Sequence, residues 1–402
     1  MPRFEPFNAI RYAAEVNWDD VIAPPYDVLS EDDVIDLGHR SRHNITWIDV
    51  PRGDDNRYKV AAYLLQEWLA KGVLVRESQP SLTIYRMDLT DASGTARTIS
   101  GVLGGLEVVD EGAGGVLPHE RTTKKASTDR LDLTIATGAN LSPVWGLSLA
   151  SGLTAALAAP GDPVGEITVD GVTHRAERVT DPDRIAEIRR IIGSDDVLIA
   201  DGHHRYSISR TYRDKVRKAL RRNDTAAEFT LAFVNELVDD QLSIEAIHRI
   251  YDGISFDQLK HDLAGSFTFE PMTEELGPHT LARMVTDQRL VLLSPDGKAQ
   301  WLVPRTGAFE GVRDLDGAWL EHALAGSQAK VNYQHGLDQV LDQLKGSGPI
   351  GKPAGAVLIR PSSLAEIRRT AREGLLMPPK STFFTPKLRT GVVIRPTARL
   401  PH

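Results

Sequence analysis

The chain of 402 residues contains no cysteine. Disulfide frameworks, zinc sites built from thiolates and thiol nucleophiles are therefore all excluded, whatever the fold. The absence also leaves no reason to assign the protein to an oxidising compartment. Any chemistry performed by this chain must come from its carboxylates, histidines, hydroxyls and cationic side chains.

Long apolar runs and an excess of positive charge are also missing. No stretch approaches the roughly 18 apolar residues of a membrane-spanning helix, and residues 1–7 lack the apolar run of a signal peptide. The 47 Lys and Arg residues are outnumbered by 55 Asp and Glu, giving a formal net charge of −8. Such a balance provides no broad attraction for nucleic acid or acidic membranes. We expect a cytoplasmic protein without a nucleic-acid or membrane partner.

The length and the pattern of elements indicate a protein of two parts. At 402 residues the chain exceeds the size of a single hydrophobic core, and its 41% apolar content is that of an ordinary globular protein. Strand-like and helix-like segments alternate along the whole chain, which favours a mixed α/β (α+β) architecture without fixing the strand order. We predict a catalytic core over residues 1–250 and a C-terminal α/β region over residues 251–402.

Local patterns predict several individual elements. A helix is expected over 57–71, capped by Asn56, with an inward stripe of Val60, Tyr63, Leu64 and Trp68. The other predicted elements are a hairpin at 167–178 around Asp170-Gly171, a helix at 182–192, a buried strand at 197–200, a helix from His203 to about Leu220, and further elements at 229–234, 256–264, 290–303, 314–325, 337–345, 356–359 and 363–373.

The segment 198–206 is the strongest candidate for a site. A buried strand delivers Asp201 to its end, Gly202 permits a tight turn, and the next helix offers unpaired N–H groups and a positive N-terminus to an anion. Behind the turn, Arg205 can bind phosphate with two donors. Capping of the helix would also explain the aspartate by itself. The phosphate-binding candidates of this segment are Gly202, His203, His204 and Arg205.

Three other segments could contribute to the same site. After a glycine-rich stretch at 110–117, the segment 118–125 brings a carboxylate, a histidine and cations that could close over a phosphorylated ligand, although a solvated charged loop has the same composition. The segment 378–382 combines two prolines with Lys380, Ser381 and Thr382, which could donate to an anion or form a plain turn. The stretch 23–27 is either a structural turn or a wall of the site.

Together these motifs resemble the domain-of-unknown-function family numbered one thousand and fifteen, over nearly the whole chain. The motifs are Ala-Pro-Pro-Tyr-Asp at 23–27, His-Glu-Arg-Thr at 119–122, Asn-Leu-Ser-Pro at 140–143, the 201–206 segment, and 377–382. Pro-His-Glu at 118–120, Asp-Gly-His-His-Arg at 201–205 and Pro-Lys-Ser-Thr at 379–382 also resemble, in the same order, the archaeal free L-serine kinase of the ParB/sulfiredoxin superfamily.

The resemblance implies a ParB/sulfiredoxin-like nucleotide-binding core with large elaborations. It implies a phosphotransferase that uses ATP or ADP and Mg²⁺ to phosphorylate free L-serine, or a similar hydroxyl compound, to O-phosphoserine. Glu120 and Asp201 match the essential carboxylates of the kinase. The implied substrate-binding residues are His119, Arg121 and Thr122, and the implied phosphate ligands are Gly202, His203, His204, Arg205, Lys380, Ser381 and Thr382.

Other functions remain to be weighed against a kinase. A ParB-like nucleotide-binding switch needs no acceptor, but no DNA-reading element accompanies the motifs. A sulfiredoxin-like reductase is excluded because the catalytic cysteine is absent. A zinc site formed by His119, His203 and His204 is possible, but adjacent histidines rarely point at one metal.

Overall fold

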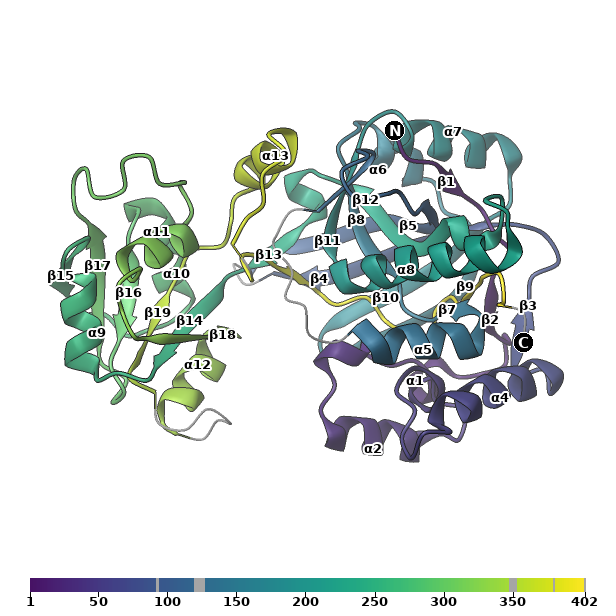
Figure 1. The fold of residues 1–402 in the computed structure, drawn as a ribbon, viewed down its shortest axis with the longest axis horizontal. Helices are drawn as coiled ribbons and strands as arrows, with labels where there is room; N and C mark the ends of the chain where they lie inside the picture. The colour runs from purple at the N-terminus through teal and green to yellow at the C-terminus, as the bar shows by residue number, and fades with distance from the viewer. Residues whose placement is uncertain (92–93, 119–126, 347–352, 379, 401–402) are drawn as a thin grey trace.

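The computed structural model describes residues 1–91, 94–118, 127–346, 353–378 and 380–400. Two α/β units lie side by side, with β13 (Ser243–Glu245) and α13 (Leu364–Arg372) drawn between them (Figure 1). The mixed α/β class predicted from the sequence is confirmed. Within the described residues, no helix is both long enough and apolar enough to span a membrane.

The larger unit is built on a mixed sheet. In the part of the chain that the structure describes, only the pairs β6–β11 and β8–β12 are parallel, and the other pairs of this sheet are antiparallel. Among the described residues this sheet has nine strands, with β1 (Phe4–Glu5) pairing beside β5 and the others in the spatial order β6 (Val116–Pro118), β11 (Val197–Asp201), β8 (Val144–Ser148), β12 (Phe229–Glu236), β5 (Ala96–Glu107), β4 (Leu82–Thr90), β10 (Val172–Val179), β9 (Asp162–Val169).

Helices cover this sheet, and alternate residues of β11 show how its two faces are buried. Val197 and Ile199 pack with the helices α6 and α7, whereas Leu198 and Ala200 belong to the core on the opposite face, which includes Trp68 of α4. This two-sided burial explains the continuous apolar run of β11. The helices of the larger unit are α1 (Trp18–Val21), α2 (Glu31–Arg40), α3 (Thr46–Asp49), α4 (Arg57–Ala70), α5 (Ser127–Thr137), α6 (Leu153–Leu157), α7 (Pro182–Ile192) and α8 (His203–Leu220).

The smaller unit is a three-layer structure around an antiparallel sheet. Its strands, in spatial order, are β15 (Phe267–Pro271), β17 (Ala299–Pro304), β16 (Leu290–Leu293), β19 (Gly355–Leu358), β14 (Ile247–Asp252) and β18 (Lys330–His335). One face packs against α9 (Phe256–Leu263) and α11 (Asp316–Ala323), and the other against α10 (Pro278–Asp287) and α12 (Leu337–Leu344). Leu292 and Val291 of β16 belong to these two opposite cores, as strand alternation requires.

The C-terminal segment returns from the smaller unit to the larger one. After α13, β20 (Phe383–Thr385) pairs with β13, and β21 (Arg395–Pro396) pairs with β7 (Ala139–Asn140). Between these two pairs, Ile394 exchanges backbone hydrogen bonds with Ile10 of β2 (Ile10–Tyr12), which itself pairs with β3 (Leu74–Arg76). The C-terminal segment is thus packed on the larger unit.

Two helices predicted from the sequence are present in the structure, but one of them buries a partly different set of residues than predicted. The helix at 182–192 is confirmed as α7: Asp181 accepts a hydrogen bond from the Arg184 N–H at 2.7 Å. The helix at 57–71 is confirmed as α4. Of its predicted stripe, Trp68 is buried and Leu64 packs against the core, whereas Val60 and Tyr63 are 52% and 65% exposed. The buried face carries Ala61 and Leu65 beside Trp68, and Asn56 makes no capping hydrogen bond.

Candidate active site

The turn between β11 and α8 presents a carboxylate beside an uncapped helix N-terminus. Gly202 has φ 83°, in the left-handed region, and α8 begins at the next residue without a side-chain cap. A Cβ at this position would lie 3.0 Å from the Arg205 Nε atom, so both conformation and space favour glycine. The N-terminus of α8, with its positive dipole end and no side-chain cap, is therefore suited to an anion.

Two cations hold the carboxylate of Asp201. The Oδ2 atom lies 3.1 Å from Nη2 of Arg205 and 3.4 Å from Nζ of Lys387. Burial raises the pKa of Asp201, but Arg205, Lys387 and His203 together outweigh it and hold that pKa well below the ordinary aspartate range. Asp201 is therefore ionised at neutral pH, and 27% of its side chain remains exposed to a ligand.

Arg205 links the turn to two other parts of the chain. Its guanidinium donates to the backbone carbonyl of Pro143 and to Asp201, and it lies 3.6 Å from Oδ2 of Asp27. Burial lowers its pKa, but Asp201 and Asp27 more than compensate, so the pKa is raised and the guanidinium stays charged. In the described structure this side chain fixes the turn, and its direct contact with a phosphate stays a prediction.

Motifs that are far apart in the sequence meet at a small polar cavity beside Arg205. The cavity has a volume of about 50 Å³ and is lined in part by Tyr26, Asn140 and Ser142 from two of the motifs identified in the sequence. Its volume suits a few water molecules or a small polar group. The 23–27 stretch, left open between turn and wall, thus borders the same site as the 140–143 motif.

Asp49 and Arg130 complete this cavity, and neither was among the site residues predicted from the sequence. Nη1 of Arg130 lies 3.2 Å from Oδ1 of Asp49, and the Ser142 hydroxyl donates to the same carboxylate at 3.3 Å. Burial raises the pKa of Asp49, although Arg130 and Arg205 oppose the rise. The guanidinium of Arg130 also lies 4.3 Å from the centroid of the Tyr26 ring. A single Asp at the end of a short helix gives no sequence signal for this role.

Lys387 is the lysine of the C-terminal segment that the structure brings to Asp201. Its ammonium lies over the Phe383 ring at 4.3 Å, which helps to position it, and its side chain is 18% exposed. Sequence reasoning concentrated on Lys380, seven positions earlier, because that lysine stands in a recognisable motif. A lysine in an irregular segment has no pattern of its own, so its contact with Asp201 could not be predicted.

The predicted phosphate-binding segment around Lys380 lies against the smaller unit. The Lys380 carbonyl accepts a hydrogen bond from Nη1 of Arg249 at 3.1 Å, and the Ser381 hydroxyl donates to the Pro378 carbonyl at 2.7 Å. The side chains of Ser381 and Thr382 are buried, whereas that of Lys380 is exposed. The assignment of Lys380, Ser381 and Thr382 to one site with Asp201 stays a prediction.

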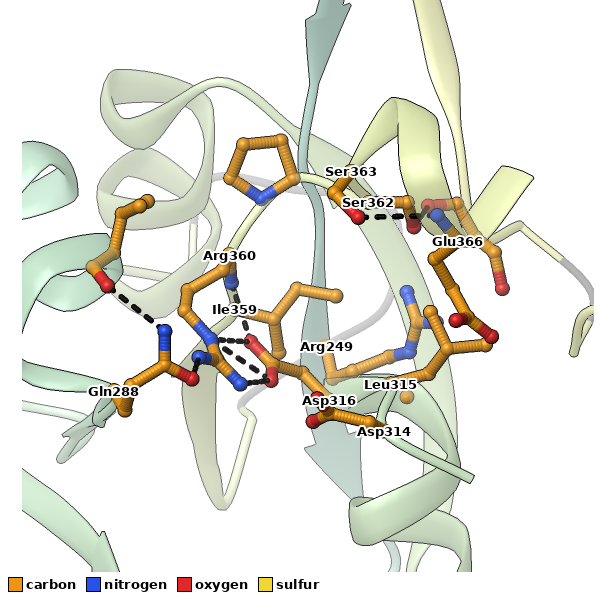
Figure 2. Close-up of a pocket in the computed structure, with 14 residues that line it drawn as sticks. Arg249, Gln288, Asp314, Leu315, Asp316, Ile359, Arg360, Ser362, Ser363 and Glu366 are labelled. Atoms are coloured by element: carbon orange, nitrogen blue, oxygen red, sulfur yellow. Dashed lines mark hydrogen bonds and ion pairs between the residues drawn. The ribbon is translucent and has the colours of Figure 1, made fainter. Parts of the chain in front are cut away.

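Ser381 also lines a second polar pocket, of about 170 Å³, in the smaller unit (Figure 2). There Arg360 points toward the Asp316 carboxylate, with Nε 3.1 Å from each carboxylate oxygen, and Gln288 contacts the same guanidinium (Figure 2). The Ser363 hydroxyl accepts a hydrogen bond from the Glu366 N–H and caps α13. The Arg360 guanidinium in this pocket is thus already paired with a carboxylate of the protein.

The remaining predicted site residues are placed less fully. His119, Glu120, Arg121 and Thr122 lie outside the described residues. His203 and His204 open α8 and are half-buried. In the part of the chain that the structure describes, no group of three or more His, Asp or Glu side chains is gathered to hold a metal ion.

The fold and this site define a mixed α/β protein with an ionised aspartate at the junction of a strand and a helix N-terminus. The chain belongs to the family described as "Protein of unknown function (DUF1015)", whose model matches residues 4–318. The suspected family resemblance is therefore confirmed. Lys387 and Lys380 lie beyond the matched residues.

Comparison with solved structures finds distant similarities. A conserved hypothetical protein from Pyrococcus furiosus is 14% identical with a TM-score of 0.37, and the match covers 71% of this chain and 92% of that one. A free serine kinase in complex with AMP is 11% identical with a TM-score of 0.36, covering 67% and 84%. SbnI with a C-terminal truncation, from Staphylococcus aureus, is 14% identical with a TM-score of 0.36, covering 70% and 82%. Among curated proteins, no sequence matches the chain.

Proposed function

We propose that the protein is a small-molecule kinase that transfers a phosphoryl group from ATP or ADP to the hydroxyl of free L-serine or a similar compound. One observation carries the proposal. An ionised Asp201 stands at the uncapped N-terminus of α8, with the cations Arg205 and Lys387 on the same carboxylate. Phosphoryl transfer needs this combination, an acceptor for the hydroxyl proton next to positive groups that bind phosphate.

Each group has a role in the proposed reaction. The first-turn N–H groups of α8 and the Lys387 ammonium hold the transferred phosphoryl group, and Asp201 accepts a hydrogen bond from the attacking hydroxyl. The hydroxyl oxygen forms a bond to phosphorus as the bond to the leaving nucleotide oxygen breaks, and the hydroxyl proton passes to Asp201. Mg²⁺ bound with the nucleotide would supply further neutralisation of phosphate charge.

The low pKa of Asp201 is compatible with this role because the Lys387 ammonium can contact either the Asp201 carboxylate or a bound phosphate. A bound phosphate draws the ammonium of Lys387 away from the carboxylate, since the phosphate carries more negative charge. Removal of one neighbouring cation raises the pKa of an aspartate toward its ordinary value and makes it a better proton acceptor. A loose transition state also places little demand on the strength of the base.

The decisive experiment is a direct assay of product. The purified protein is incubated with Mg²⁺, ATP or ADP, and a panel of hydroxyl compounds that includes L-serine, and phosphorylated product is identified by mass spectrometry. We expect O-phosphoserine or a related phosphomonoester, formed by the wild type and by Asp195→Asn, a control that removes a carboxylate paired with Arg372. Tight nucleotide binding without product from any acceptor would refute the kinase and favour a ParB-like nucleotide switch.

A further inference from the structure

A chain of side-chain contacts connects the smaller unit with Asp201. The imidazole ring of His335, at the end of β18, lies parallel to the ring of Phe383 in β20, with ring centroids 4.2 Å apart and an interplanar angle of 10°. Nζ of Lys387 lies 4.3 Å from the centroid of the same phenyl ring and 3.4 Å from Oδ2 of Asp201. One face of a phenyl ring has no room for both groups at these distances, so the imidazole and the ammonium lie on opposite faces. We call His335, Phe383 and Lys387 the Phe383 stack.

Strand pairing holds both rings of the Phe383 stack against one short segment of the chain. Phe383 is opposite Glu245 in the β13–β20 pair, and His335 is opposite Ile247, the first residue of β14. The two strands that carry the rings are thus both paired with residues 245–247. The relative position of the rings therefore follows from backbone pairing as well as from the contact between the rings.

The charge in the Phe383 stack comes from Lys387. Burial lowers the pKa of His335 more than Glu245 raises it, and Lys387 lowers it further, so the neutral imidazole predominates at pH 7. A neutral ring adds no charge repulsion against the ammonium, and the negative face of the phenyl ring attracts it. A lysine side chain is long and flexible, so the groups that confine it determine how often its ammonium reaches Asp201.

We propose that His335 is a positioning residue for Lys387. It stacks on Phe383, the phenyl ring holds the ammonium, and the smaller unit thereby sets the position of a cation in the candidate active site. The effect on turnover rests on the proposed function, in which Lys387 holds the transferred phosphoryl group. The effect on the pKa of Asp201 depends on the geometry of the stack alone.

Carboxyl NMR of Asp201 tests the positioning without any assay of activity. His335→Ala removes the stacked ring, so Lys387 should spend less time at Asp201, and the pKa of Asp201 should rise part of the way toward its value in Lys387→Met. In the double variant with Lys387→Met, His335→Ala should cause no further rise. His322→Ala is the matched control: this histidine of α11 contacts Phe309 edge-on within the smaller unit, and its removal should leave the titration of Asp201 unchanged.

A conservative replacement separates stacking from a general role in the fold. His335→Phe keeps a stacked ring and should titrate as the wild type does, whereas Phe383→Leu removes the ring face and should raise the pKa of Asp201 at least as much as His335→Ala. If His335→Ala fails to fold by circular dichroism, His335→Thr carries the test, because a β-branched residue suits a strand and also lacks the ring. Identical titration of Asp201 in the wild type and in the folded variant without the ring would overturn the proposal. An equal rise in His335→Phe and in that variant would overturn it as well.

The kinase assay separates this inference from the proposed function. If Lys387 holds the phosphoryl group, His335→Ala should lower kcat by about three- to thirtyfold, the size of one cation–π contact, and leave KM for the acceptor unchanged. A rise in the pKa of Asp201 in a protein that phosphorylates no acceptor would refute the kinase and support the positioning role. Unchanged titration and unchanged kcat in His335→Ala of an active kinase would refute the positioning role alone.

Discussion

At the scale of single residues, the chemistry depends on a carboxylate held between two cations. Arg205 and Lys387 stabilise the ionised form of Asp201 more than burial destabilises it, so the pKa of Asp201 falls instead of rising. An aspartate that only capped α8 would bond to the backbone of its first turn, whereas Asp201 directs Oδ2 to the two cations. This geometry argues that the residue does more than cap a helix.

The first prediction concerns Asp201→Asn. The amide keeps the size of the side chain but cannot accept the hydroxyl proton, so turnover should fall by about a hundred- to ten-thousand-fold. Steady-state kinetics measures the loss, and circular dichroism checks that the fold is retained. A folded Asp201→Asn protein with near-normal turnover would show that the residue has no role in proton transfer.

A second prediction concerns Lys387→Met, which removes the ammonium and keeps most of the length. Loss of a contact to the transferred phosphoryl group should cost about 2–4 kcal/mol, or roughly thirty- to a thousandfold in turnover. Lys380→Ala, measured in parallel, should show a similar loss only if Lys380 also faces the phosphate. A change of less than about twofold in either variant would assign that lysine to the ordinary surface.

The pH dependence provides a third prediction at the same scale. Because the pKa of Asp201 is depressed in the folded protein, its ionisation stabilises the fold above the unfolded aspartate pKa of about 3.9, and the stabilisation is lost as pH falls. Carboxyl NMR of Asp201 should therefore show titration below the ordinary aspartate range. Lys387→Met should raise that pKa, and an unchanged titration would mean that the Lys387 contact does not form in solution.

At the scale of elements, the β11–α8 junction depends on the backbone conformation of Gly202. The fourth prediction is that Gly202→Ala destabilises the protein by about 1–3 kcal/mol, because alanine is strained at φ 83° and its Cβ meets the Arg205 side chain. Gly72→Ala is the control, since φ there is 74° but nothing lies within 4 Å of a Cβ. Urea unfolding measures the loss of stability in each variant. Equal losses would mean that backbone strain alone accounts for the effect at Gly202, without a contribution from the contact with Arg205.

Sequence reasoning identified elements whose ends carry a chemical signal and missed contacts made across the fold. Asp181-Pro182 and Gly193 bounded α7, and Asp170-Gly171 supplied the positive φ angles of the β9–β10 hairpin. The predicted apolar stripe of α4 was right for Leu64 and Trp68 but wrong for Val60 and Tyr63, which the tertiary structure leaves exposed to solvent. Lys387 was missed for a related reason, since its contact joins segments 186 positions apart.

At the scale of the whole molecule, the path of the chain joins the two units near the candidate site. The division into residues 1–250 and 251–402 stays a proposal, and the structure adds that the smaller sheet includes β14, which begins at Ile247. The chain then passes through β20, delivers Lys387 to Asp201 and continues into the core of the larger unit. The smaller unit is thus joined to the larger unit by two segments of the chain.

The last prediction tests whether this return path supports the site. Ile394, which lies seven residues beyond Lys387, is fully buried. It exchanges backbone hydrogen bonds of 2.9 and 3.0 Å with Ile10. Truncation of a buried isoleucine usually costs about 2–5 kcal/mol, so Ile394→Ala should destabilise the larger unit by that amount. Hydrogen exchange should quicken in β2 and β7, because the C-terminal segment pairs with both strands.

Val331→Ala is the matched control for this test. Val331 is 40% exposed on the edge strand β18 of the smaller unit, so its truncation should change the free energy of unfolding by less than about 0.5 kcal/mol. If the C-terminal segment positions Lys387, Ile394→Ala should also weaken nucleotide binding at temperatures where the protein stays folded, whereas Val331→Ala should not. Loss of stability with unchanged nucleotide affinity would show that the segment supports the fold alone and that Lys387 is positioned by its contact with Phe383.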